Sequence, residues 1–281
     1  MPFVKKKKMS SISFLKEFPE NGLTMPALFI GHGSPMNGIE DNEFSRTWRD
    51  LGKKLPTPTA VLVVSAHWLT RGTHVTAMNF PRTIHDFGGF PSALYEVQYP
   101  AKGSPILAEE TQRLVKKAPI GLDHEWGLDH GAWTIIRHMY PSADIPVLQL
   151  SIDYGRDLNY HYDLAKELKE LRKRGVLIVG SGNMVHNLRM VAWDKLYEPN
   201  YGFDWAHQMN QVFKDLISKS NHTDLIHYEK LGKEALLAIP TPDHYIPLLY
   251  TLALQAEGEG VSFFNDRAVG GSLTMTSVMI G

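Results

Sequence analysis

The stretch Ala27-Leu-Phe-Ile-Gly-His32-Gly-Ser-Pro35 decides the fold, because an apolar run of four residues ends in a glycine-rich turn that carries a histidine. The run is short enough for a buried strand, and the glycines and the proline prevent it from continuing. The same order returns in Ala60-Val-Leu-Val-Val-Ser-Ala-His67 and, more loosely, in Val176-Leu-Ile-Val-Gly-Ser-Gly-Asn-Met-Val-His186. Ligands of α/β proteins bind just beyond the carboxyl ends of strands. The three histidines therefore predict a common site there.

Further elements alternate along the chain between helical and strand-like patterns. We expect helices over residues 42–51, 104–117, 132–140, 158–174, 205–218, 225–237 and 245–255, and additional strands over 74–78, 144–152, 261–264 and 273–280. Residues 79–103 contain too many prolines and glycines for a long element. The pattern predicts a single α/β domain with a largely parallel or mixed central sheet, flanked by helices, and a ligand site at the carboxyl ends of the strands.

Composition excludes several functional classes. The chain of 281 residues contains 43% hydrophobic and 21% charged residues, which is typical of a globular protein with a sizeable core. A net charge of −1 provides no general attraction to nucleic acid or to an anionic membrane, and no apolar run approaches the roughly 18 residues of a membrane span. The absence of cysteine excludes disulfides and thiolate metal ligands, and it favours a cytoplasmic protein.

The amino-terminal residues differ from the rest of the chain. Lys5 to Lys8 form a basic cluster, but the following residues are too polar and too few for the apolar core of a signal peptide. We therefore expect residues 1–24 to be a partly ordered extension and residues 25–281 to form the domain.

The irregular segment contains Ile84-His-Asp-Phe-Gly-Gly-Phe-Pro91 and, shortly after it, Tyr95. Long loops inside compact domains are often functional. The aromatic side chains of this loop would suit one wall of a pocket for a planar ligand.

Histidine is the residue type that carries the candidate chemistry, since neutral imidazole is a good ligand for zinc or iron. His32, His67 and His186 are joined by a fourth candidate, His244, which lies at the expected start of a helix. Asp243 precedes it, but neighbouring side chains usually diverge, so we do not expect both to bind one ion. His130, also at a helix start, is either an acid/base group or a helix-capping or core residue.

Six motifs together resemble the 4,5-DOPA extradiol dioxygenase family, within the class III, LigB-type ring-cleaving enzymes. They are GHGSP with His32, SAHW with His67, TIHDFGGFP over residues 83–91, LDHGAW with His130, SGNMVHNL with His186 and TPDHYIPLLY with His244. All six occur in the order of the family, and the resemblance spans residues 25–281.

The resemblance implies one divalent metal ion per chain, bound by His32, His67, His186 and His244. In the wider LigB group two histidines and a glutamate bind Fe(II), whereas here His244 stands where the carboxylate would be. The ion is therefore Zn(2+) or Fe(2+), and His186 is either a fourth ligand or the acid/base. The implied reaction opens the ring of a catechol such as L-DOPA with O2 and gives a muconic-semialdehyde-type product, with His130 or His186 exchanging protons.

Zinc leaves an alternative open, because it has no redox chemistry with which to activate dioxygen. A zinc-dependent hydrolase or a catechol-binding protein could use the same histidines. The expected partners are a small catechol and O2, without nucleic acid or membrane, and the sequence does not specify an oligomeric state.

Overall fold

The computed structural model describes residues 14–20 and 22–281. In this described part of the chain, an eight-stranded sheet has the order β4-β3-β5-β2-β6-β1-β10-β7. Its strands are β1 (Ala27–Gly31), β2 (Ala60–Thr70), β3 (Thr73–Thr76), β4 (Ile120–Asp123), β5 (Val147–Asp153), β6 (Val176–Gly182), β7 (Val261–Phe264) and β10 (Ser277–Ile280). A small hairpin joins β8 (Ala268–Val269) to β9 (Leu273–Thr274).

The centre of the sheet is parallel and its margins are mixed. Strand β6 lies between β1 and β2 and is parallel to both, and β5 is parallel to β2. Strand β10 is antiparallel to β1 and β7, and β3 is antiparallel to β5. The mixed α/β sheet predicted from the sequence is thereby confirmed. Because β1, β6 and β2 are parallel neighbours, the residues that follow them meet at one edge of the sheet.

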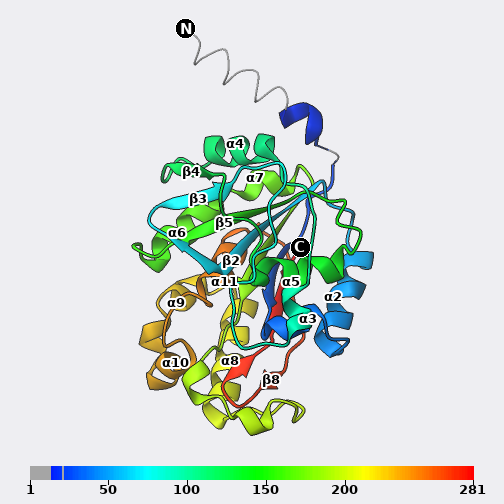
Figure 1. The fold of residues 1–281 in the computed structure, drawn as a ribbon. Coiled ribbons are helices and arrows are strands. Elements are labelled where there is room, and N and C mark those ends of the chain that lie inside the picture. Colours follow the sequence, from blue (N-terminus) through cyan, green and yellow to red (C-terminus); the bar gives the residue numbers. More distant parts are fainter. Residues whose placement is uncertain (1–13, 21) are drawn as a thin grey trace.

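Helices cover both faces of the sheet and form a separate core on each (Figure 1). On one face α2 (Glu43–Lys54) and α5 (His130–Met139) pack together, and the indoles of Trp48 and Trp133 are fully buried there. The other face carries α4 (Pro105–Leu114), α6 (Leu158–Lys166), α7 (Lys169–Arg172) and α11 (Ile246–Ala253). Helices α8 (Asp204–Ser218), α9 (His222–Ile226) and α10 (Lys233–Ala238) pack beside α11 and against one another. The shorter helices are α3 (Ser92–Tyr95), η1 (Pro35–Gly38), η2 (Leu188–Met190), η3 (Trp193–Lys195) and η4 (Tyr228–Leu231).

Alternation of side chains along the strands explains the two cores. In β1, Ala27 and Phe29 belong to one core, while Leu28 and Ile30 belong to the other. Successive side chains of a strand point to opposite faces, and a strand buried on both faces therefore reads as a continuous apolar run.

Several predicted elements have wrong boundaries. The helix expected over 158–174 is two helices, α6 and α7, and the one expected over 225–237 is broken at Gly232, whose φ of 112° is not helical. The strand expected over 273–280 is divided between β9 and β10, and β4 was not predicted. Strand β4 has four residues, of which only Ile120 is buried, so its sequence carries little periodic signal.

The expected amino-terminal extension falls largely on residues 1–13 and 21, which lie outside the described residues. Of the remainder, Phe14 and Phe18 are buried in the core that contains α4 and α7. The guanidinium of Arg174 donates to the carbonyl oxygen of Phe18 and lies over the ring of Phe14. Within residues 14–20 and 22–281, every helix falls short of the length or the apolarity needed to cross a membrane.

Candidate metal centre

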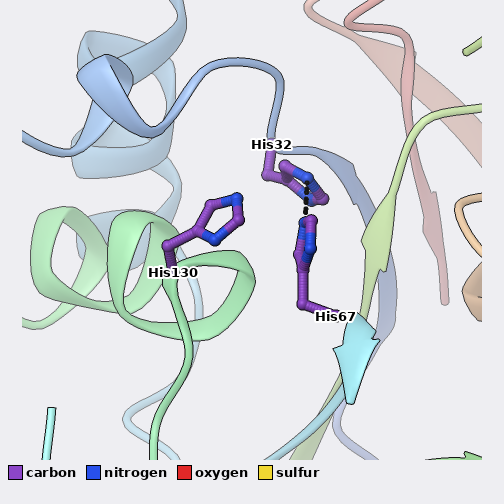
Figure 2. A group of neighbouring side chains, drawn as sticks. All are labelled: His32, His67 and His130. Carbon is purple, nitrogen blue, oxygen red and sulfur yellow. Dashed lines mark hydrogen bonds between the residues drawn. The ribbon is translucent and has the colours of Figure 1, made fainter. Parts of the chain in front are cut away.

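The five candidate histidines lie together at the edge of the sheet where the parallel strands end. His32 follows β1 directly, His67 lies near the end of β2, and His186 follows β6 after a short turn. His130 is the first residue of α5, and His244 precedes α11. Figure 2 shows the rings of His32, His67 and His130 turned toward one another from three separate elements.

The distances divide the five histidines into a compact group of three and a stacked pair. One ligand nitrogen of each of His32, His67 and His130 lies within 4.8 Å of the others. The rings of His186 and His244 stack face to face, with centroids 3.6 Å apart and an interplanar angle of 6°. His244 connects the two groups, because its centroid is 5.3 Å from that of His32 and 4.9 Å from that of His67.

The hydrogen bonds of Ser181 define the tautomer of His32. The Ser181 hydroxyl donates to the carbonyl oxygen of Gly131 at 2.6 Å, so its oxygen accepts a hydrogen bond from Nδ1 of His32 at 2.9 Å. With the proton on Nδ1, Nε2 of His32 carries the free lone pair. That atom lies 3.0 Å from Nε2 of His67 (Figure 2).

His130 and His244 each donate a hydrogen bond from Nδ1 to an aspartate carboxylate. Nδ1 of His130 donates to Asp86 Oδ2 at 2.9 Å, and Nδ1 of His244 donates to Asp243. Burial raises the pKa of each carboxyl, but hydrogen bonds from the partner histidine outweigh it and leave both pKa values below the usual range. Both carboxylates are thus ionised acceptors. In its neutral form, each of these histidines then carries the free lone pair on Nε2.

The imidazoles deeper in the site are neutral. Burial, followed by the charges of neighbouring histidines, holds the pKa of His32 and of His67 well below its ordinary value. Burial and His244 lower the pKa of His186 to about 3. Neutral imidazole is the form that binds a metal ion, and ligating histidines usually donate their second nitrogen to a carboxylate or another oxygen.

These features fit a divalent ion. Two nitrogens that each lie about 2.1 Å from one ion, at an angle between 90° and 109°, are separated by about 3.0–3.4 Å. The 3.0 Å between the Nε2 atoms of His32 and His67 falls in this range. A lone pair on Nε2, set by Ser181 or a carboxylate, is the donor that such an ion requires.

A buried polar network centred on Asp129 lies next to the histidines of the site. The Asp129 carboxylate, which is fully buried, accepts hydrogen bonds from the Ser65 hydroxyl and the Gln149 side chain, both at 2.7 Å. It also caps α5 by accepting the backbone N–H of Ala132 at 3.1 Å. Burial and the nearby charge of Asp86 raise the pKa of Asp129.

The aromatic loop, which comprises residues 84–91 and Tyr95, packs against His130. The ring of Phe87 packs edge-on against His130 at 5.6 Å between centroids, and Phe90 and Tyr95 pack against Phe87. Indole Nε1 of Trp133 donates to the carbonyl oxygen of Ile84 and so attaches the loop to α5.

The structure brings together the five histidines singled out from the sequence, but sequence reasoning missed most of the residues that support them. Asp86 was part of the aromatic loop without a role of its own, because its partner lies 44 positions away. Asp243 and His244 were expected to diverge, and this was wrong, since the carboxylate folds back onto Nδ1 of the neighbouring ring. Ser181 and Asp129 carried no signal beyond their strand-end and helix-cap positions.

Comparison with known proteins agrees with this geometry. The family profile described as "Catalytic LigB subunit of aromatic ring-opening dioxygenase" matches residues 26–267. The chain belongs to the LigB family. It is 47% identical to an Escherichia coli protein named "4,5-DOPA dioxygenase extradiol", over 95% of this chain and 98% of that protein. A Beta vulgaris protein of the same name is 34% identical over 89% of this chain and 94% of its own length.

A solved structure resembles the LigB chain throughout its length. The crystal structure of an uncharacterized protein from Escherichia coli K12 superimposes with a TM-score of 0.79 at 42% identity, covering 92% of this chain and all of the other. The family and its named relatives identify an extradiol ring-cleaving dioxygenase, which acts on a small aromatic molecule with O2. The histidine group could bind the metal on which such chemistry depends.

The backbone of His244 lies very close to Gly182 in this LigB site. A Cβ atom at Gly182 would lie 2.1 Å from the carbonyl oxygen of His244, which also accepts the N–H of Asn183. We expect Gly182→Ala to displace His244 and to lower the free energy of unfolding by about 1–3 kcal/mol, as overpacking does. Urea denaturation measures this.

Gly260→Ala is the matched control, because a Cβ atom at that position meets nothing within 4 Å. We expect its stability to stay close to that of the unaltered protein. Equal stabilities for the two variants would contradict the close contact between β6 and the His244 segment.

Proposed function

We propose that this dioxygenase opens the ring of a catechol such as L-DOPA and forms a muconic-semialdehyde-type product. The observation that carries the proposal is the convergence of the rings of His32, His67, His130 and His244 beside the aromatic loop. The names of the Escherichia coli and Beta vulgaris relatives support DOPA as the substrate. A flat, apolar wall at Phe87 suits a catechol ring.

One divalent ion per chain would be held by His32, His67 and His244, with His186 as a fourth ligand or as the acid/base. A bound ion would acidify the catechol hydroxyls, and Fe(2+), unlike Zn(2+), would also supply the one-electron chemistry that dioxygen needs. We therefore assign Fe(2+) to the active protein and expect the zinc form to be inactive. This assignment distinguishes ring cleavage from the zinc-hydrolase alternative.

His130 and His186 are the residues that we assign to proton transfer. Neutral His130 donates from Nδ1 to Asp86 and so has its lone pair on Nε2, where it can accept a proton from a catechol hydroxyl. His186 is neutral and stacks on His244, which places it beside the same site. A histidine that has accepted a proton can return it when the ring opens.

We also propose that residues 25–281 form the catalytic unit and residues 1–24 an extension to it, as the match to residues 26–267 supports. The lack of cysteine supports a cytoplasmic location.

Removal of a ligand tests the metal assignment. We expect His32→Ala or His67→Ala to lower both bound metal and the melting temperature, because an ion that binds only the folded chain stabilises it. Metal analysis of the purified protein and thermal unfolding with and without chelator measure the two effects. His74→Ala, on β3, is a control that should change neither. Full metal content in both ligand variants would remove these histidines from the site.

Labelled oxygen tests the reaction. We expect the Fe(2+)-loaded protein, mixed with L-DOPA and ¹⁸O2, to consume one O2 per catechol and to place both labelled atoms in the ring-opened product. Mass spectrometry of the product reads the label, and oxidation to a quinone would incorporate none. Absence of label with every catechol tried, despite bound Fe(2+), would favour the hydrolase or catechol-binding alternative.

A further inference from the structure

Asp86 is bound to His130 through both of its carboxylate oxygens. Oδ1 accepts the backbone N–H of His130 at 2.8 Å, and Oδ2 accepts Nδ1–H of the same residue at 2.9 Å. The contact joins the aromatic loop to the first residue of α5, and the side chains of Asp86 and His130 are only 16% and 7% exposed. Two hydrogen bonds to one residue fix both the position of its backbone and the rotation of its ring.

The same carboxylate lies between two histidines of the site. Asp86 Oδ2 is 3.8 Å from Nδ1 of His67, and the ring centroids of His67 and His130 are 3.9 Å apart. Asp86 thus faces the Nδ1 side of both rings. A group in this position leaves the Nε2 side of His130 free to face the substrate.

The hydrogen bond also selects a tautomer. A neutral imidazole that donates from Nδ1 to a carboxylate carries its free lone pair on Nε2, whereas an unconstrained neutral imidazole exchanges between the two forms. Without Asp86, part of the His130 population would hold its proton on Nε2 and could not accept one there. The ring would also lose the restraint on its rotation.

We propose that Asp86 is a positioning residue for ring cleavage, which acts through His130 by fixing the tautomer and orientation of its imidazole. This inference rests on the role proposed above for His130. Carboxylates that orient an active histidine typically contribute 10- to 100-fold to metal affinity or activity. Asp86 hydrogen-bonds to His130, whereas its Oδ2 lies 3.8 Å from Nδ1 of His67, beyond hydrogen-bonding distance. We therefore expect its removal to reduce turnover more than metal content.

A double-mutant cycle tests whether Asp86 acts through His130. We expect Asp86→Ala to lower kcat by about 10- to 100-fold with bound metal retained. In a His130→Gln background the same change should have no further effect. Asp86→Asn, which keeps the size of the side chain but has a single acceptor oxygen, should lose activity in the same direction.

Asp157→Ala is the matched control, because Asp157 caps α6 by accepting the N–H of Tyr160 and lies outside the site. It should lower stability without lowering kcat. If Asp86→Ala lowered kcat by the same factor in the unaltered protein and in the His130→Gln background, this inference alone would be wrong. Unchanged turnover of His130→Gln would overturn the proposed role of His130 and this inference with it.

Nuclear magnetic resonance provides a readout that does not depend on activity. In zinc-loaded protein labelled with ¹⁵N-histidine, long-range ¹H–¹⁵N spectra should show His130 protonated on Nδ1, with the signal assigned by its loss in His130→Gln. Asp86→Ala should move this residue toward the form protonated on Nε2, and Asp157→Ala should not. An unchanged tautomer in Asp86→Ala and Asp86→Asn would contradict the proposal.

Discussion

The fully buried carboxylate of Asp129 is the constraint on which the site depends. It joins three elements, because it accepts hydrogen bonds from Ser65 on β2, from Gln149 on β5 and from the first turn of α5. A buried carboxylate without these partners would be strongly destabilising, so the three elements are held at one separation. His67 lies two residues after Ser65, and His130 follows Asp129 directly. The 3.9 Å between their ring centroids is a consequence of this arrangement.

The parallel strands at the centre of the sheet position the part of the site that contains His32 and His244. Gly31 of β1 is in register with Gly182 of β6, and Ser65 of β2 is in register with Ser181 of β6. Ser181 can therefore reach both the ring of His32 and the carbonyl oxygen of Gly131, which connects the sheet to α5. Glycine at position 182 admits the backbone of His244. Hydrogen-bond direction and burial together keep the ring of His32 neutral, with its Nε2 atom available.

The sequence predicts this site well where it depends on strand ends and poorly where it depends on contacts across the fold. Short apolar runs that end in a histidine locate His32, His67 and His186, since the carboxyl ends of parallel strands must meet. The partners of those rings cannot be derived in the same way. Asp86 and His130 are 44 residues apart, and Ser181 and His32 are 149 apart, so no local pattern reports their contact. The helix predicted over residues 225–237 was wrong because Gly232 has a non-helical backbone conformation within an otherwise helical pattern.

We expect the proposed metal ion to lie between the Nε2 atoms of His32 and His67. Anomalous diffraction from crystals of the metal-loaded protein, recorded on both sides of the absorption edge of the metal, locates the ion and identifies its element. We expect one site per chain, with both Nε2 atoms about 2.0–2.2 Å from the ion and with Nδ1 of His32 still directed at Ser181. An ion bound elsewhere, or one that contacts neither His32 nor His67, would contradict it.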